Sequence, residues 1–184
     1  MGYFCKIIHL LPVSVLFCFS LFAQVPYSET NFIAPLNIPL VLAGTFGELR
    51  SNHFHSGIDI KTKGKEGFPV IAIQDGYISR IKVASGGYGK ALYLTHYNGY
   101  VSVYAHLKNF QSDISRYLID EQYKRQSFSV DLFPDKEDLI YEKGDTIGWT
   151  GNSGSSSAPH LHFEIRDAKT QQVINPLLFG FKAK

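Results

Sequence analysis

Short runs of alternating apolar and polar residues recur along the chain and predict a protein built mainly of antiparallel β-strands. Asp75-Gly76 and Asn98-Gly99 tolerate the positive φ angles of tight turns, so each dipeptide predicts a hairpin between the runs that flank it. The runs are rich in Val, Ile and Tyr: VLAGTF from residue 41, PVIAI from 69, GYISRIKV from 76, KALYLTHY from 90, YVSVYAH from 100 and LHFEIRD from 161.

One segment, SDISRYLIDEQYKRQ at residues 112–126, departs from this strand pattern. It opens on Ser112, a candidate N-cap, and we expect it to form one surface helix inserted into a sheet protein. Its apolar residues follow helical spacing: Ile114, Tyr117, Leu118 and Tyr123.

The first 23 residues have the form of a secretory signal peptide: Lys6, then an apolar run, then the small residue Ala23. A membrane-spanning helix is disfavoured because the run is short, contains Pro12 and ends without a basic stop. We expect cleavage near Ala23, export to the periplasm or cell envelope, and no stable membrane span afterwards. Cys5 and Cys18 would leave with the signal, so the mature chain would not depend on disulfides.

Length and charge limit the possible partners. The 184 residues have room for one ordinary domain, which we place at residues 41–181 behind a lead-in segment at 24–40. The 18 basic and 16 acidic residues are spread along the sequence and give a formal net charge of +2. We therefore expect no nucleic-acid partner, and nothing in the sequence identifies a protein partner.

The first candidate for chemistry is HLHFEI, residues 160–165, behind a loop rich in Gly and Ser. Side chains alternate along a strand, so His160 and His162 share one face. Leu161 and Phe163 take the other face, which suits a core. The two histidine Cα atoms would lie about 6.5 Å apart. One imidazole can then bind a metal while the other reaches a water molecule on it.

The second candidate is HFHSGID, residues 53–59, in which His55 and Asp59 offer a nitrogen and an oxygen. This is the mixed ligand type of hydrolytic zinc sites. A straight strand would hold the two residues about 13 Å apart, so we expect the chain to bend at Ser56-Gly57. Asp59 would then point away from the isoleucines beside it and into a site.

Together these motifs predict a zinc site of the catalytic type. His55 and Asp59 need a third ligand, and three protein ligands leave a fourth position open for water. Either His160 or His162 completes the set, and residue types alone do not choose between them. The remaining imidazole and His106, at the end of YVSVYAH, would act as base and electrostatic partner, because zinc lowers the pKa of its water towards the range where imidazole works.

Three other features have competing interpretations. His96, at a strand end, is interpreted as a hydrogen-bonded or surface residue. His53 would either support a ligand or simply face solvent. The loop GNSGSSSA, residues 151–158, is either a plain turn or an edge of the substrate groove.

The order HxxxD, YAH, HLH resembles the zinc metallopeptidases of the M23 family, the lysostaphin and LytM type of peptidoglycan endopeptidase. The resemblance covers roughly residues 41–179, from AGTFGELRSNHFHSGIDI through YGKALYLTHYNGYVSVYAHL and KGDTIGWTGNSGSSSAPHLHFEI to INPLLF. It implies a mainly β fold, with an antiparallel sheet or sandwich and a groove that holds one Zn²⁺. Its implied substrates are the peptide stems and bridges of peptidoglycan.

The resemblance also implies individual roles. It makes His55, Asp59 and His162 the zinc ligands, and His106 with His160 the catalytic pair. The predicted activity is zinc-dependent hydrolysis of peptidoglycan peptides. The alternative is a cell-wall binding or amidase-activating module of the same fold, although such a module would not need both catalytic imidazoles. A third interpretation, zinc storage or a structural role, predicts a closed site with four ligands.

Two features depart from the family pattern. Some members place a Tyr ahead of the first ligand, whereas this chain has GELRSNHF. There Arg50 would either replace the Tyr as an oxyanion donor or form a structural salt bridge. The second departure is an insertion at about residues 109–137, which would wall the groove, carry a partner surface or restrict access.

Overall fold

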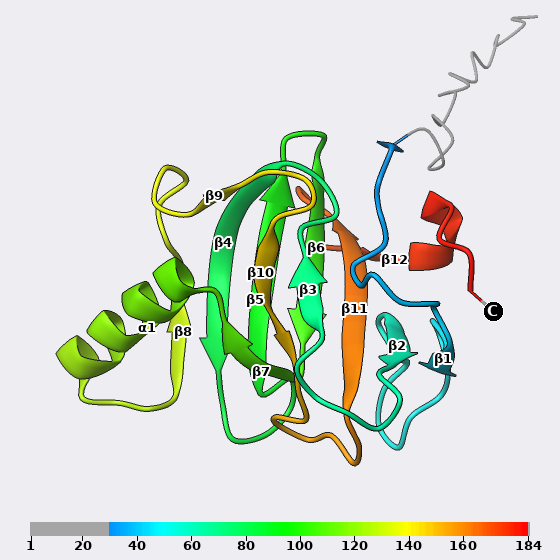
Figure 1. The fold of residues 1–184 in the computed structure, drawn as a ribbon, viewed down its shortest axis with the longest axis horizontal. Helices are drawn as coiled ribbons and strands as arrows, with labels where there is room; N and C mark the ends of the chain where they lie inside the picture. The colour runs from blue at the N-terminus through cyan, green and yellow to red at the C-terminus, as the bar shows by residue number, and fades with distance from the viewer. Residues whose placement is uncertain (1–29, 184) are drawn as a thin grey trace, which may run out of the picture.

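Two antiparallel β-sheets pack against each other in the computed structural model, which describes residues 30–183 (Figure 1). The strands of the larger sheet are β1 (Leu42–Gly44), β2 (Ile58–Lys61), β4 (Gly76–Val83), β5 (Lys90–His96), β6 (Tyr100–Ala105), β8 (Val130–Leu132), β9 (Ile140–Tyr141), β11 (His160–Asp167) and β12 (Val173–Ile174). The smaller sheet consists of β3 (Pro69–Ile71), β7 (Leu107–Phe110) and β10 (Thr146–Thr150). One α-helix, α1 (Ser112–Arg125), and a short 3-10 helix, η2 (Pro176–Phe179), complete this part of the chain.

The strand order shows how distant segments meet. The larger sheet runs β1-β2-β11-β6-β5-β4-β8, with β12 beside β11 and β9 beside β4, and the smaller runs β3-β10-β7. The prediction of a mainly antiparallel β fold with one inserted helix is therefore confirmed. The predicted signal peptide and both cysteines lie outside the described residues. Within residues 30–183, no helix has the length and apolar character needed to cross a membrane.

The main core lies between the two sheets. Ile60, Leu92 and Phe163 of the larger sheet and Leu107 and Ile147 of the smaller sheet are fully buried there. Because side chains alternate, the opposite face of the larger sheet is free to carry other residues. It holds a smaller apolar cluster: Ala91, Tyr93, Val101, Val103 and Ala105.

Of the two predicted hairpins, one is confirmed and one is wrong. β5 pairs with β6 across Asn98-Gly99, and Gly99 has a φ of +88°. Across Asp75-Gly76, however, β3 pairs with β10 while β4 pairs with β5, so the chain crosses from one sheet to the other. Gly76 is the first residue of β4, where a Cβ atom would come within 2.3 Å of the carbonyl oxygen of Thr95. This glycine permits close strand contact and not a turn.

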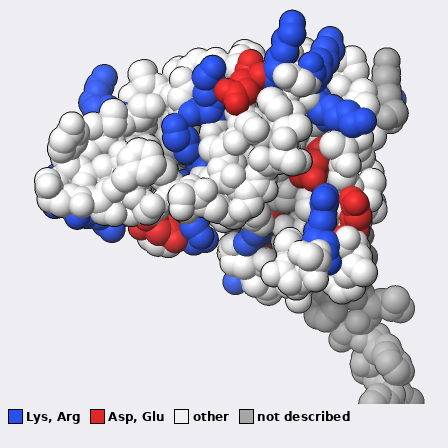
Figure 2. Space-filling view, turned by 90° about the horizontal axis from the view of Figure 1, so that it is seen from below, with Lys and Arg blue, Asp and Glu red and all other residues white. Residues whose placement is uncertain are grey.

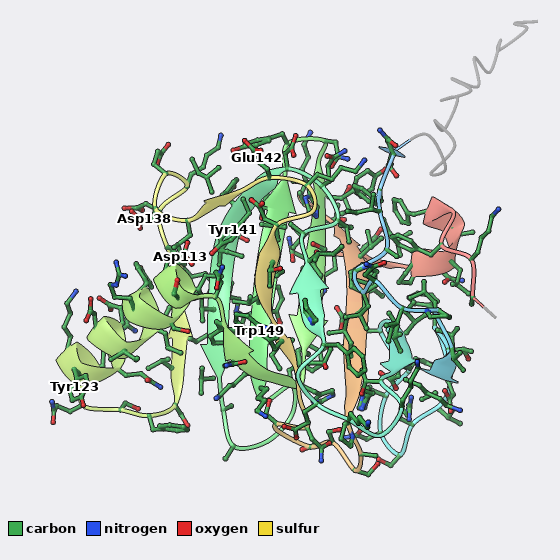
Figure 3. The ribbon with its side chains drawn as sticks, viewed as in Figure 1. Asp113, Tyr123, Asp138, Tyr141, Glu142 and Trp149 are labelled. Atoms are coloured by element: carbon green, nitrogen blue, oxygen red, sulfur yellow. The ribbon has the colours of Figure 1, made fainter. Side chains whose placement is uncertain are left out.

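The inserted helix differs from the prediction at its start. Gln111 is the N-cap residue and its side chain accepts from the Ser112 N–H, so Ser112 begins the helix instead of capping it. Ile114 and Leu118 are buried, whereas Tyr123 is exposed at the far end of α1 (Figure 3). The hydroxyl of Tyr141 donates to Asp113 and links β9 to the start of α1.

His96 is a buried, hydrogen-bonded residue, as its interpretation proposed. The residue is 2% exposed. Nδ1 lies 3.1 Å from the carbonyl oxygen of Asp75, and Nε2 lies 2.8 Å from the hydroxyl of Ser102. Burial lowers the pKa of His96 to about 4, so the ring is neutral at neutral pH.

This burial predicts a pH-dependent stability. Between pH 6.5 and 4 the unfolded chain binds the His96 proton and the folded chain does not, so the free energy of unfolding falls as the pH falls. The stabilisation is fully present above pH 6.5, and its loss reaches about 3 kcal/mol by pH 4. Urea unfolding at pH 7 and pH 4.5 should show a smaller loss for His96→Gln than for the unchanged chain. An equal loss in both proteins would contradict the assignment.

Candidate metal centre

The register between β2 and β11 brings Asp59 and His162 together. Asp59 lies directly opposite His162, and on its other side His162 lies opposite Ala105 of β6. Leu161 and Phe163, which alternate with the histidines, are fully buried in the main core. The predicted alternation along this strand is therefore correct, and it turns the histidines to the outer face of the larger sheet.

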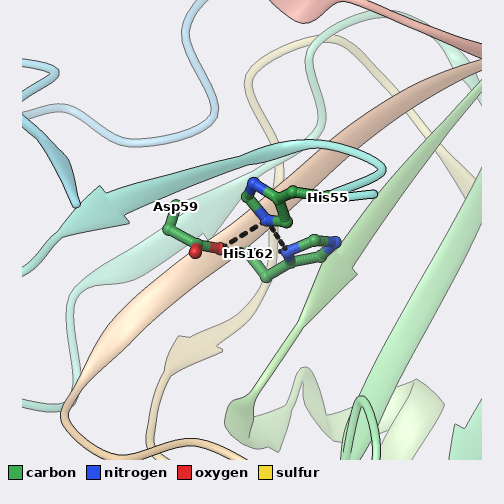
Figure 4. A group of neighbouring side chains, drawn as sticks. All are labelled: His55, Asp59 and His162. Atoms are coloured by element: carbon green, nitrogen blue, oxygen red, sulfur yellow. Dashed lines mark hydrogen bonds and ion pairs between the residues drawn. The ribbon is translucent and has the colours of Figure 1, made fainter. Parts of the chain in front are cut away.

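A bend before β2 brings in His55. The chain bends at Gly57, where a Cβ atom would come within 2.2 Å of the carbonyl oxygen of Phe163. Glycine is required here for close approach to β11. As a result, His55 Nε2 lies 3.1 Å from Asp59 Oδ1 and 3.0 Å from His162 Nδ1, so the three side chains converge on one point (Figure 4).

Outer partners fix which ring nitrogens face that point. His55 Nδ1 lies 2.8 Å from the carbonyl oxygen of Thr45, to which it donates. His162 Nε2 lies 2.8 Å from Glu164 Oε1 and donates to that carboxylate. The nitrogens that remain, His55 Nε2 and His162 Nδ1, therefore turn lone pairs towards Asp59 Oδ1.

The donor set fits a divalent metal ion. The three converging atoms are separated by 3.0, 3.0 and 3.1 Å. Zinc with bonds of about 2.1 Å and tetrahedral geometry separates its ligands by about 3.4 Å. The triangle therefore needs to open by only a few tenths of an ångström, and a cation between the lone pairs would remove their mutual repulsion.

The charges of the cluster depend on one another. Burial opposes ionisation of Asp59, but hydrogen bonds with the three surrounding histidines hold its pKa well below the usual range. Burial lowers the pKa of His162, yet hydrogen bonds to Asp59 and Glu164 outweigh burial and raise it. A metal ion and a proton therefore compete for this side chain.

His106 and His160 lie beside the cluster. His106 follows β6 with a φ of +58°, a conformation uncommon for residues other than glycine, and this turns its ring towards His160. The centres of the two rings are 4.8 Å apart. His160 Nε2 lies 3.4 Å from Asp59 Oδ1. Burial lowers the pKa of His106 to about 4, so this ring is neutral at neutral pH.

Glu164 is a residue that the sequence analysis missed. It is fully buried, and its Oε1 accepts from His162, from Ser56 Oγ at 2.5 Å and from the hydroxyl of Tyr88. Its Oε2 accepts from Arg166 Nε at 2.7 Å. These partners hold the pKa of Glu164 at about 2 although burial acts to raise it. The sequence does contain a pattern that predicts this contact: Glu164 lies two positions after His162 on one strand, so both side chains share a face.

The cluster lies in a cavity of about 610 Å³, lined also by Ser155, Ser156 and Ala158 of the predicted loop. Arg50 lies in its wall with Nη2 2.9 Å from Asp59 Oδ2, so Arg50 forms a salt bridge to this carboxylate. His53 also lines the cavity; it is exposed, and its Nδ1 lies 2.6 Å from Asn52 Oδ1.

The insertion at residues 109–137 lies elsewhere. Its strand β8 pairs with β4 at the far edge of the larger sheet. None of the described residues that line the cavity belongs to the insertion. The insertion therefore does not line this cavity.

Comparison with known proteins agrees with this geometry. Residues 53–117 match the model of peptidase family M23. The chain is 32% identical over 129 residues to the DD-carboxypeptidase/endopeptidase Mpg of Neisseria meningitidis, covering 70% of this chain and 23% of that protein. It is 31% identical over 123 residues to an uncharacterized metalloprotease of Haemophilus influenzae, covering 67% of this chain and 20% of that one. The chain thus spans less than a quarter of these relatives.

Solved structures share the fold. The catalytic domain of the antimicrobial peptidase lysostaphin from Staphylococcus simulans superimposes with a TM-score of 0.56 at 23% identity, covering 76% of this chain and 91% of that domain. At this identity the likeness establishes the fold alone. Taken with the family match and the similarity to Mpg, it shows that the chain belongs to peptidase family M23.

Proposed function

We propose that this chain is a zinc-dependent endopeptidase that hydrolyses peptide cross-links or stems of cell-wall peptidoglycan. The observation that carries the proposal is the convergence of three acceptor atoms from His55, Asp59 and His162 on one point next to two further imidazoles. A zinc ion held there would polarise the scissile carbonyl and acidify a water molecule. Similarity to a relative named a DD-carboxypeptidase/endopeptidase supports a peptide substrate of this class.

His106 and His160 are suited to move protons and bind charge. His106 Nδ1 lies 2.8 Å from the carbonyl oxygen of Ser153, and His160 Nδ1 lies 2.8 Å from that of Ala158. Each ring thus donates through Nδ1 to the backbone and keeps Nε2 for the cavity. A neutral ring would accept the proton of the attacking water at Nε2. The other ring would donate from Nε2 to the carbonyl oxygen as an imidazolium, with both of its nitrogens protonated, as negative charge develops.

Glu164 positions the third ligand. Because its carboxylate accepts from His162 Nε2, it holds the ring in the tautomer that offers Nδ1 to the metal. Arg166, Ser56 and Tyr88 hold the carboxylate in turn. We assign Glu164 a positioning role, since it reaches the metal site only through His162.

The sequence prediction of export completes the proposal. A signal peptide at residues 1–23 would deliver a domain at 41–181 to the periplasm or cell envelope, where peptidoglycan lies. The alternative is a cell-wall binding or amidase-activating module that keeps the fold and turns over nothing. Chelation and substitution separate these two proposals.

Purified peptidoglycan should be cut by the zinc-loaded chain. New peptide ends should appear, and removal of zinc with a chelator should abolish their release, as should His55→Ala, which removes one of three ligands. Mass spectrometry of the soluble fragments measures both effects. Binding to the wall without new ends would favour the non-catalytic module, and release that is indifferent to chelation would exclude the zinc mechanism.

His106→Ala and His160→Ala should each lower kcat/KM by about 100-fold or more, the usual scale for loss of a general acid or base. Both variants should retain one zinc ion per chain by metal analysis. His53→Ala, which also removes a histidine from the cavity wall, is the matched control and should stay near full activity. Loss of zinc from His106→Ala would instead indicate a closed site with four ligands.

Glu164→Gln should weaken zinc binding by about 10-fold to 100-fold, the scale observed for partners of metal-bound histidines. Competition with a chromogenic chelator measures this affinity without any substrate. Glu66→Gln, which removes an exposed carboxylate paired with Lys108, is the control. Unchanged zinc affinity in Glu164→Gln would contradict the positioning role, and urea unfolding of the variant distinguishes it from simple loss of folding.

A further inference from the structure

Cationic side chains outnumber carboxylates along the cavity. Among its described lining residues, Arg50, Lys61 and Lys63 are cationic, and Asp59 is the one carboxylate. Arg50 is already paired with Asp59 and with Glu48. Within residues 30–183, Lys61 and Lys63 form no salt bridge or side-chain hydrogen bond, so their charges are available to a ligand.

Lys61 stands beside the proposed catalytic residues. It is the last residue of β2, two positions after Asp59, and therefore shares the outer face of the sheet with it. Its register partner on β11 is His160. The Lys61 side chain thus extends along the cavity wall next to His160, about 6.5 Å along the strand from Asp59.

Lys63 lies in a turn that hydrogen bonds hold in place. Lys63 and Gly64 have φ values of +55° and +69°, which reverse the chain directly after β2. Thr62 between the two lysines is fully buried, and its hydroxyl lies 3.0 Å from the carbonyl oxygen of Pro159 and 2.6 Å from that of Lys65. These contacts fasten the turn to the segment that leads into His160.

The same end of the molecule is rich in positive charge. Figure 2 looks at the end where the turn after β2 and the loop before β11 lie, and blue Lys and Arg side chains project around much of its rim, with fewer red Asp and Glu side chains among them. Such a surface favours an anionic ligand over a neutral one.

We propose that Lys61 and Lys63 form a carboxylate-binding subsite that selects a peptide with a free carboxylate next to the scissile bond. This inference rests on the proposed function and names its substrate class. A D-alanyl-diaminopimelate cross-link has a carboxylate on the carbon bonded to the scissile nitrogen. A glycine bridge has none. The subsite therefore assigns the enzyme to cross-links of the first kind.

Two synthetic peptides test the subsite. Both contain a D-alanyl-diaminopimelate bond; one keeps the free carboxylate beside the scissile nitrogen, and the other has a carboxamide there. The zinc-loaded full chain should cleave the carboxylate peptide with a higher kcat/KM, by roughly fivefold for one exposed charge pair and up to about 25-fold for two. The preference should shrink as salt is added.

Substitution of the two lysines tests whether they cause the preference for the carboxylate peptide. The double variant Lys61→Gln, Lys63→Gln should lose it, with kcat/KM for the carboxylate peptide falling to that for the carboxamide peptide. Lys65→Gln is the matched control, because Lys65 lies in the same turn but does not line the cavity. It should retain the preference.

Other outcomes overturn the subsite. Equal cleavage of both peptides by the unchanged chain excludes it, and so does an equal loss on both peptides in the double variant. If neither peptide is cleaved, the proposed function is in question. Calorimetric binding of both peptides to zinc-loaded His106→Ala then decides the subsite separately: tighter binding of the carboxylate peptide supports it, and equal affinity excludes it.

Discussion

The register between β2 and β11 is the constraint on which the site depends. It sets Asp59 opposite His162 and Lys61 opposite His160, so one pairing places two of the three candidate metal ligands and one lysine of the cavity wall. A slip of one residue would turn the side chains of one strand to the other face. Buried Ile58, Ile60 and the apolar residues of β11 oppose such a slip, because it would expose them to water.

Charge explains why so many polar groups can be buried on this face. Three acceptors from His55, Asp59 and His162 meet at about 3 Å, which is unfavourable unless a cation or a proton lies between them. Around them, each remaining polar atom has a partner: Thr45 for His55, Glu164 for His162 and Arg50 for Asp59. The cluster therefore behaves as one network, in which removal of an outer partner disturbs the inner ligands.

The sequence predicts those features that follow from local periodicity. Alternation along residues 160–163 and the bend at Gly57 follow from the residues themselves. Long-range contacts do not. The dipeptide Asp75-Gly76 has the composition of a turn. Its glycine is instead required because the backbone of Thr95, in the neighbouring strand, leaves no room for a Cβ atom. Likewise, Thr62 holds the turn after β2 through Pro159, which is 97 positions away. Glu164 lies between these cases, since alternation alone would have placed it beside His162.

The inserted segment that carries α1 has a consequence for solubility. β4 is a long strand near the edge of the larger sheet, and its backbone would be a template for pairing with another molecule. β8 covers its Ile81–Val83 end and β9 covers its Gly76–Tyr77 end, so what remains at the border is two very short strands. β8 of the inserted segment and β9, which follows that segment, thus shield the larger sheet from edge-to-edge self-association, at the side of the sheet away from the cavity.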